Sequence, residues 1–286
     1  MSDGEDERMQ PSMWTSYLMD QTPEEMVQTF AAHGWRHLEM SDEHAKVLLE
    51  RGAPAATGEA LRAVAESHGV TIRQGHLWLQ CDLCARDGQA LLDTLRRWLD
   101  LFVALGIRAA VLHPGGREMA EDGASPKAIQ GVRLERLVVL CDHVRGTGLS
   151  ICLENVPGCG EVDDLLAIIE AVGRENLGIC LDTGHLNMGS GDQAGFIRSA
   201  GAYLRATHLA DNEGQTDQHL MPFGRGTVDW RAVMGGLNAI GYQGLLNYEI
   251  PGESHGVPLP IRLAKLDYLH RVTDYLLALA STGDAA

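Results

Sequence analysis

The sequence predicts a single closed α/β barrel in which eight parallel strands alternate with helices. Short, nearly continuous apolar runs alternate strictly with helical patterns, which is typical of a parallel sheet covered by helices. Eight such runs can be distinguished, and a count of eight favours a closed barrel over an open sheet. The length of 286 residues also fits one such domain, since barrels of this kind commonly need about 250 residues.

The first half of the chain is expected to supply four of the strands. Residues 1–12 are polar and acidic, so we expect a disordered tail there, followed by one barrel domain over residues 13–286. Thr22 and Pro23, followed by two glutamates, indicate a capped helix start with acidic residues in the first turn. The expected strands are 13–18, 35–40, 70–75 and 107–112, and the expected helices are 23–33, 42–51, 57–68 and 87–105.

The second half continues the same alternation. Strands are expected at 149–153, 177–181, 203–207 and 244–248, and helices at 126–146, 162–173, 192–201 and 229–240. No G-x-G-x-x-G fingerprint follows the first strand, which further disfavours an open doubly wound sheet. The segments 117–126 and 211–228 are long enough to cover the mouth of the barrel.

The charge balance argues against anionic partners. The chain has 23 Lys and Arg against 39 Asp and Glu, a formal net charge of −16, which opposes attraction to nucleic acid and to anionic membrane surfaces. No apolar stretch reaches the roughly 18 to 20 residues of a membrane span, and the acidic start lacks the features of a signal peptide. We therefore expect a cytoplasmic protein with no nucleic-acid and no membrane partner.

The cysteines are expected to be reduced, because a chain of this size can form a core without disulfides. Cys81 and Cys84 are spaced as in half of a zinc knuckle or a redox pair. No second pair stands at a matching distance, so ordinary packing residues are favoured over a metal or redox site. The sequence alone assigns this pair no specific role. The six cysteines are Cys81, Cys84, Cys141, Cys152, Cys159 and Cys180.

Carboxylate and histidine side chains end four consecutive expected strands. They are Glu154, Asp182, His208 and Glu249. The carboxyl ends of parallel strands meet at one face of a barrel, so these side chains can point inward at one height. A strand-end Asp or Glu is often only a helix cap or a loop residue, but four at matching positions predict a site for a divalent metal ion.

A second group of possible metal or substrate ligands surrounds the first. His185 lies three residues after Asp182, so one strand end and its turn can supply two side chains to the same cavity. A lone histidine is as often bonded to a backbone carbonyl, but together this group can hold further cations, up to three ions in all. The group comprises His76, His113, His185, Asp217 and His219.

These motifs carry a family resemblance. The segments 153–156, 181–185, 208–212, 217–230 and 248–249 resemble those of the sugar phosphate isomerase/epimerase superfamily of xylose isomerase-like TIM barrels, the AP endonuclease family 2. The resemblance covers about residues 13–280. The superfamily also includes endonuclease IV, and the match to its nine zinc ligands is complete: His76, His113, Glu154, Asp182, His185, His208, Asp217, His219 and Glu249.

The resemblance implies a metal-dependent isomerase or epimerase that acts on a sugar, keto-sugar or sugar phosphate. In epimerases of this superfamily two metal-bound glutamates remove and return a proton next to a carbonyl, and Glu154 and Glu249 match them here. His185 would then hydrogen-bond the substrate. Aromatic side chains at the mouth are expected to stack on a sugar ring, although such residues are more often part of the packing: Trp14, Trp78 and Phe223.

Two alternatives remain open at the level of sequence, a multi-zinc phosphodiesterase like endonuclease IV and a barrel that binds metal or ligand without turnover. The acidic loop Ser41–His44 argues against the first because it would repel phosphate. Arg225 stands where the family usually has an acidic residue between two glycines, and it is expected to meet an anionic or polyhydroxylated substrate.

The identity of the metal is not fixed by the sequence. A mainly oxygen ligand set favours Mn or Mg, Co is compatible, and recruitment of the outer histidines would shift the preference towards Zn. The expected partner is a small-molecule carbohydrate. The oligomeric state is left open, although homodimers are the commonest assembly of soluble proteins.

Overall fold

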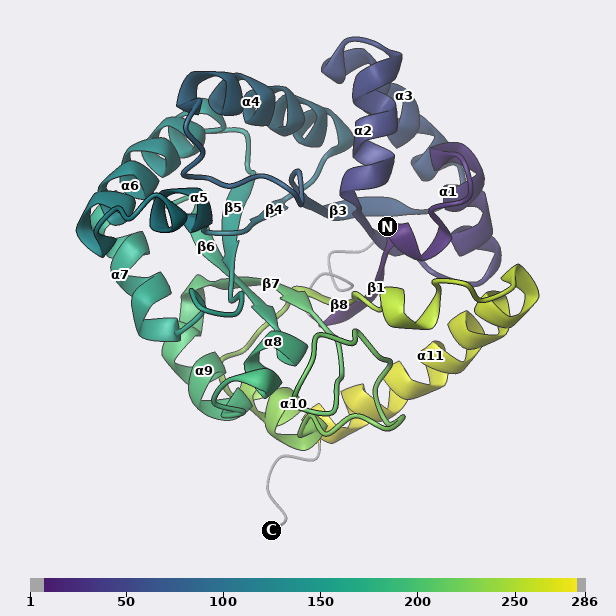
Figure 1. Cartoon of the computed structure of the whole chain (residues 1–286). Coiled ribbons are helices and arrows are strands. Elements are labelled where there is room, and N and C mark those ends of the chain that lie inside the picture. Colours follow the sequence, from purple (N-terminus) through teal and green to yellow (C-terminus); the bar gives the residue numbers. More distant parts are fainter. Residues whose placement is uncertain (1–7, 282–286) are drawn as a thin grey trace.

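The structure, a computed structural model, describes residues 8–281 as eight parallel strands ringed by helices (Figure 1). The sheet has the order β7-β6-β5-β4-β3-β2-β1-β8, and every neighbouring pair is parallel. The two ends of this order join, because the backbone N–H of Leu209 donates to the carbonyl of Asn247 at 2.7 Å and Leu209 bridges Tyr248 in parallel. The predicted closed eight-stranded α/β barrel is therefore confirmed.

The strands have lengths of four to six residues, as expected for the inner wall of such a barrel. They are β1 (Gln10–Trp14), β2 (His37–Met40), β3 (Thr71–His76), β4 (Ala109–Leu112), β5 (Ser150–Glu154), β6 (Leu177–Asp182), β7 (Leu204–His208) and β8 (Leu245–Tyr248). The α-helices are α1 (Pro23–Ala32), α2 (Asp42–Arg51), α3 (Pro54–Ser67), α4 (Gly88–Leu105), α5 (Arg117–Glu121), α6 (Pro126–His143), α7 (Val162–Val172), α8 (Thr183–Met188), α9 (Gln193–Ala200), α10 (Trp230–Ala239) and α11 (Leu259–Ser281). Within residues 8–281, three 3₁₀ turns complete the list: η1 (Thr15–Leu18), η2 (Gly201–Tyr203) and η3 (Pro251–Glu253).

The first strand lies earlier than the sequence predicts. The expected strand 13–18 splits into the end of β1 and the buried turn η1, whereas residues 10–12, assigned to the acidic tail, pair with β8 and β2. The apolar run was misleading because the 3₁₀ turn buries its side chains as thoroughly as a strand would. Residues 1–7 of the expected tail lie outside the described part of the chain.

Helix starts follow the predicted capping chemistry. The side chain of Thr22 accepts from the backbone N–H of Glu25, and the Glu25 carboxylate accepts from the backbone N–H of Thr22, which completes a capping box. Gly106 ends α4 with φ of +84°, a conformation that favours glycine. The short helices α5 and α8 lie in segments that the sequence analysis left as loops.

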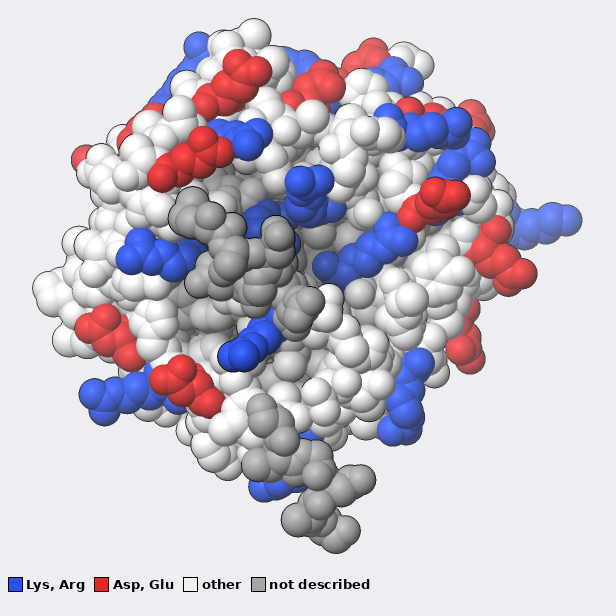
Figure 2. Space-filling view, turned by 180° about the vertical axis from the view of Figure 1, so that it is seen from behind, with Lys and Arg blue, Asp and Glu red and all other residues white. Residues whose placement is uncertain are grey.

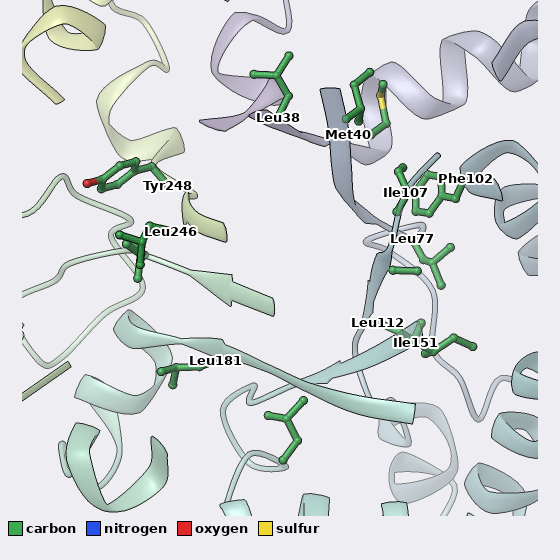
Figure 3. Close-up of a cluster of buried hydrophobic side chains, with 14 of the residues drawn as sticks. Leu38, Met40, Leu77, Phe102, Ile107, Leu112, Ile151, Leu181, Leu246 and Tyr248 are labelled. Atoms are coloured by element: carbon green, nitrogen blue, oxygen red, sulfur yellow. The ribbon is translucent and has the colours of Figure 1, made fainter. Parts of the chain in front are cut away.

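The hydrophobic core lies between the strands and the surrounding helices. Figure 3 shows part of it, including Phe102 of α4 and Ile107 close to β3. A Cβ atom on Gly75 would lie 2.8 Å from Ile107 Cδ1 and 2.8 Å from Phe102 Cε2, so only glycine lets α4 pack this closely. The close packing at Gly75 thus holds β3 in place next to His76, the residue that follows.

The two faces of the barrel differ. The carboxyl ends of the strands lie under α8, the loop before α10 and the turn η3, all of which face the viewer in Figure 1. Figure 2 shows the opposite face, where several Lys and Arg side chains gather towards the middle. Among the helices of residues 8–281, none combines the length and apolar character of a membrane-spanning segment.

One buried carboxylate orders two loops at the carboxyl-end face. Asp82, in the loop after β3, accepts backbone N–H bonds from Cys84 at 2.8 Å, Gly116 at 2.6 Å and Glu118 at 2.8 Å. Burial would raise the pKa of Asp82, but these N–H donors lower it below its usual value. The loops after β3 and β4 are thereby joined beside His113.

Candidate metal centre

Four strand ends bring their side chains to one point inside the barrel. Glu154, Asp182 and His208 are the last residues of β5, β6 and β7, and Glu249 follows β8 directly. All four are buried, at 1%, 0%, 0% and 5% exposure, and one ligand atom of each lies within 4.8 Å of the others. The structure thus brings together the four residues predicted to bind one cation, a group we call the quartet.

Several ligand atoms of the quartet have no hydrogen-bond partner among the described residues: Asp182 Oδ2, His208 Nδ1 and Glu249 Oε2. His208 Nδ1 lies 2.9 Å from Glu249 Oε2, yet the angles do not make a hydrogen bond. Buried polar atoms are rarely left without partners. Three of them directed at one point have the chemistry and the spacing that a divalent cation requires, so the residues present fit a metal ion.

The two carboxylate oxygens of Asp182 have different surroundings. Its Oδ1 accepts the backbone N–H of His185 at 2.6 Å and caps α8, while Oδ2 remains available to the quartet. Asn155 holds the same strand end, because its amide donates to the carbonyl of Asp182 at 2.9 Å and accepts from its N–H at 2.6 Å. The capping role and the metal role predicted for such a residue are therefore compatible.

The outer histidines lie around the quartet, as predicted. His76 Nε2 and His113 Nε2 each lie 3.3 Å from Glu154 Oε2, and His185 Nδ1 lies 3.2 Å from Glu154 Oε1. Asp217 contacts the Nε2 atoms of His185 and His219 at 3.2 Å and 3.0 Å. All nine predicted ligands therefore gather in one place.

These residues form three overlapping groups that can hold a metal. The quartet shares Glu154 with a group containing His76 and His113, and it shares Asp182 with a group containing His185 and His219. In three outer histidines a backbone carbonyl accepts from Nδ1: Leu77 for His76 at 2.6 Å, Asn155 for His185 at 3.0 Å and Glu249 for His219 at 2.9 Å. Their Nε2 atoms are thus left facing carboxylates, which is the ring orientation typical of metal-binding histidines.

The electrostatics of the cavity favour positive charge. Burial would lower the pKa of His76, but the hydrogen bond and charge of Glu154 raise it to about 9. Burial likewise opposes a proton on His219, yet Glu249 and Asp217 raise its pKa to about 10. The carboxylates therefore outweigh the cost of burying a cationic group here.

The sequence analysis missed Glu39, which is fully buried on β2. Its Oε1 accepts from His208 Nε2 at 3.0 Å, and its Oε2 accepts from the side-chain amide of Asn247. A signal was present, since Glu39 is an acidic residue between two apolar residues of the strand, Leu38 and Met40. Glu39 lies one residue before the end of its strand and so falls outside the pattern of strand-end residues.

The residues expected to contact substrate are distributed unevenly. Trp14 is 4% exposed at the end of β1, and Trp78 is 38% exposed after β3. Arg225 is an exposed side chain of the long loop before α10 and lies 3.7 Å from Glu213, so its contact with a substrate stays a prediction. Phe223 packs against Tyr275 of α11, with ring centroids 5.4 Å apart, rather than over the quartet.

A cavity of about 460 Å³ opens beside the centre, between the loops after β3, β4 and β5. His113 and Asp82 line it together with Cys81. Burial raises the pKa of the Cys81 thiol to about 12, and the Cys84 thiol is buried as well. Such thiols are poor metal ligands and poor nucleophiles, which agrees with a structural role for this pair.

Residues 27–270 match the family described as xylose isomerase-like TIM barrel. The chain belongs to this family. This chain is 27% identical over 168 residues to a ketose 3-epimerase of Arthrobacter globiformis, covering 55% of this chain and 54% of that protein. It is also 33% identical over 94 residues to a probable endonuclease 4 of Ureaplasma parvum, covering 29% and 28% of the two chains.

A solved structure of a D-psicose 3-epimerase in the presence of D-fructose aligns with a TM-score of 0.78 at 18% identity, covering 94% of this chain and 99% of the other. A likeness at this identity supports the xylose isomerase-like fold. The chain spans about half the length of the curated relatives it matches, or less. The activity of this xylose isomerase-like protein must therefore be argued from its own residues.

Proposed function

We propose that the protein is a metal-dependent epimerase or isomerase of ketoses or related sugars. The observation that carries the proposal is the quartet of Glu154, Asp182, His208 and Glu249, whose buried ligand atoms converge and in part lack partners. The likeness to proteins named as ketose and D-psicose 3-epimerases supports the sugar as substrate class.

The quartet would hold one divalent cation. Such an ion, when bound, would polarise a substrate carbonyl and stabilise negative charge that develops on its oxygen. The donor set of three carboxylates and one histidine favours Mn or Mg over softer ions. Further cations, up to three in all, would use the two outer groups, which share Glu154 and Asp182 with the quartet.

The two glutamates are assigned to proton transfer. Glu154 and Glu249 lie at the ends of β5 and β8, with β6 and β7 between them in the barrel wall. The distances from His208 Nδ1 are 3.5 Å to a Glu154 oxygen and 2.9 Å to a Glu249 oxygen. A substrate between them would present opposite faces of one carbon to the two carboxylates. One glutamate would take the proton next to the carbonyl, and the other would return a proton from the far side.

His185 is better placed to hold a cation than to contact substrate. Its Nδ1 lies 3.0 Å from the carbonyl of Asn155, and its Nε2 lies 3.2 Å from Asp217. Both ring nitrogens are thus engaged within the protein. Hydrogen bonding to a sugar hydroxyl would require His185 to release Asp217.

Isotope exchange tests the glutamate roles. Glu249→Gln should fold and retain most of the bound metal, because the amide keeps an oxygen ligand, but it should lose exchange of the substrate proton with solvent deuterium. Glu154→Gln should also block turnover, and the two variants are expected to differ in which epimer still exchanges. Turnover of a ketose at close to the parent rate by either variant, at equal metal content, would rule out the two-glutamate mechanism.

A second candidate is a multi-zinc phosphodiesterase, favoured by the complete set of outer ligands around the quartet. Against it, α2 begins with Asp42 and Glu43 in its first turn, and the chain carries a net charge of −16. The protein is therefore expected not to bind abasic duplex DNA at physiological salt. Salt-sensitive binding with strand incision would make this second candidate the leading one.

A further inference from the structure

Glu39 is a carboxylate enclosed within the barrel, next to the quartet. It has 0% exposure and lies on β2 between Leu38 and Met40. A buried carboxylate is costly unless other groups in the protein pair with it. The hydrogen-bond partners of Glu39 therefore indicate its role in the barrel.

Those partners come from β7 and β8, the two strands that meet where the barrel closes. His208 Nε2 of β7 donates to Glu39 Oε1 at 3.0 Å, and the side-chain amide of Asn247 on β8 donates to Oε2. Both Glu39 oxygens are thus occupied by fixed donors. Neither oxygen is left to reach a substrate or a metal.

The bond from His208 has a consequence for the quartet. A histidine that donates through Nε2 has its lone pair on Nδ1, and Nδ1 is the atom that faces Glu249 and Glu154. We propose that Glu39 is a positioning residue that sets the tautomer and ring orientation of His208 for a divalent cation. The inference rests on the metal dependence of the proposed function, but not on its substrate.

Glu39 would contribute in two ways, which substitutions can separate. Glutamine keeps an oxygen acceptor for His208 but removes the negative charge. Glutamine has the size of glutamate, and the second hydrogen bond can be kept, because Asn247 Oδ1 has no partner among the described residues and can accept from the new amide after the Asn247 amide flips. Alanine removes both the acceptor and the charge.

The experiment is a titration of metal-free protein with Co²⁺, followed by visible absorption and by competition with a chromophoric chelator. Glu39→Gln is expected to weaken cobalt binding about 10- to 100-fold, the usual cost of altering the partner of a metal-binding histidine. Glu39→Ala should weaken it further and change the cobalt spectrum, because the His208 ring is no longer fixed. Thermal unfolding of each metal-free variant shows whether the fold is retained.

Ser12→Ala is the matched control. Ser12 is fully buried on β1, and its Oγ has no hydrogen-bond partner among the described residues, His208 included. This variant should bind cobalt with the affinity and the spectrum of the parent. If the parent protein fails to bind cobalt, the proposed metal dependence is wrong. If the parent binds and folded Glu39→Gln and Glu39→Ala bind equally well with unchanged spectra, the positioning role alone is wrong.

Discussion

Replacement of Asp82 by alanine should destabilise the protein substantially without touching the quartet. The carboxylate accepts three backbone N–H bonds from the loops after β3 and β4, at 2.6–2.8 Å. At about 1 kcal/mol net for each bond, the loss of all three predicts a fall of about 3 kcal/mol in the free energy of unfolding. Asp82→Asn keeps one oxygen for two of the donors and should lose only about 1 kcal/mol.

The measurement is urea unfolding followed by circular dichroism, with linear extrapolation to water. Asp87→Ala provides the control, since Asp87 caps α4 through a single N–H bond and should cost about 1 kcal/mol. Equal stabilities for Asp82→Ala and the parent would refute the argument that this carboxylate joins the two loops.

The pH dependence follows from the lowered pKa of Asp82. A carboxyl whose pKa is lower in the folded state stabilises the fold fully above its unfolded value, which is about 3.9, and this contribution is lost as the pH falls through the folded pKa. The difference in unfolding free energy between the parent and Asp82→Ala should therefore shrink in acid. A difference that stays constant from neutral pH to about pH 2 would contradict the assignment of the effect to the ionised form.

Two further predictions concern the metal and the core. Dialysis against a chelator should lower the melting temperature and abolish activity, and added Mn²⁺ should restore both. The reason is that a ligand bound only by the folded state stabilises that state. A melting temperature unaffected by either step would count against a metal centre. Gly75→Ala should cost about 1–3 kcal/mol in urea unfolding, since its Cβ would overlap Ile107 and Phe102, and a cost near zero would show that α4 shifts freely.

The sequence predicted the fold well because its local signals agree with the tertiary arrangement. The cap at Thr22 placed the start of a helix, and strand-end residues identified the carboxyl-end face. The first strand was displaced because strand pairing of the polar residues 10–12 leaves no apolar pattern. Such pairing depends on β8, which is more than 200 residues away in the chain.

The candidate site was predictable where ligands end strands and unpredictable where they do not. Glu39 was missed because it lies one residue before the end of its strand, and its role depends on a contact with His208 of β7. Loop residues were harder still: Phe223 adopts a φ of +61° and packs outwards against Tyr275, which cannot be read from its neighbours in sequence. Hydrophobic periodicity predicts helices and strands, whereas the conformation of a loop such as the one that holds Phe223 depends on its tertiary contacts.

The side chain of Asn155 acts in place of a further rung in the ladder between β5 and β6. Its amide exchanges both hydrogen bonds with the backbone of Asp182, just beyond the point where Glu154 ends its strand. The separation of the Glu154 and Asp182 backbones is thus fixed by this amide pair without an ion. An ion that enters would need little rearrangement of its first ligands, so discrimination between cations would fall on the donor atoms and their spacing rather than on an induced closure.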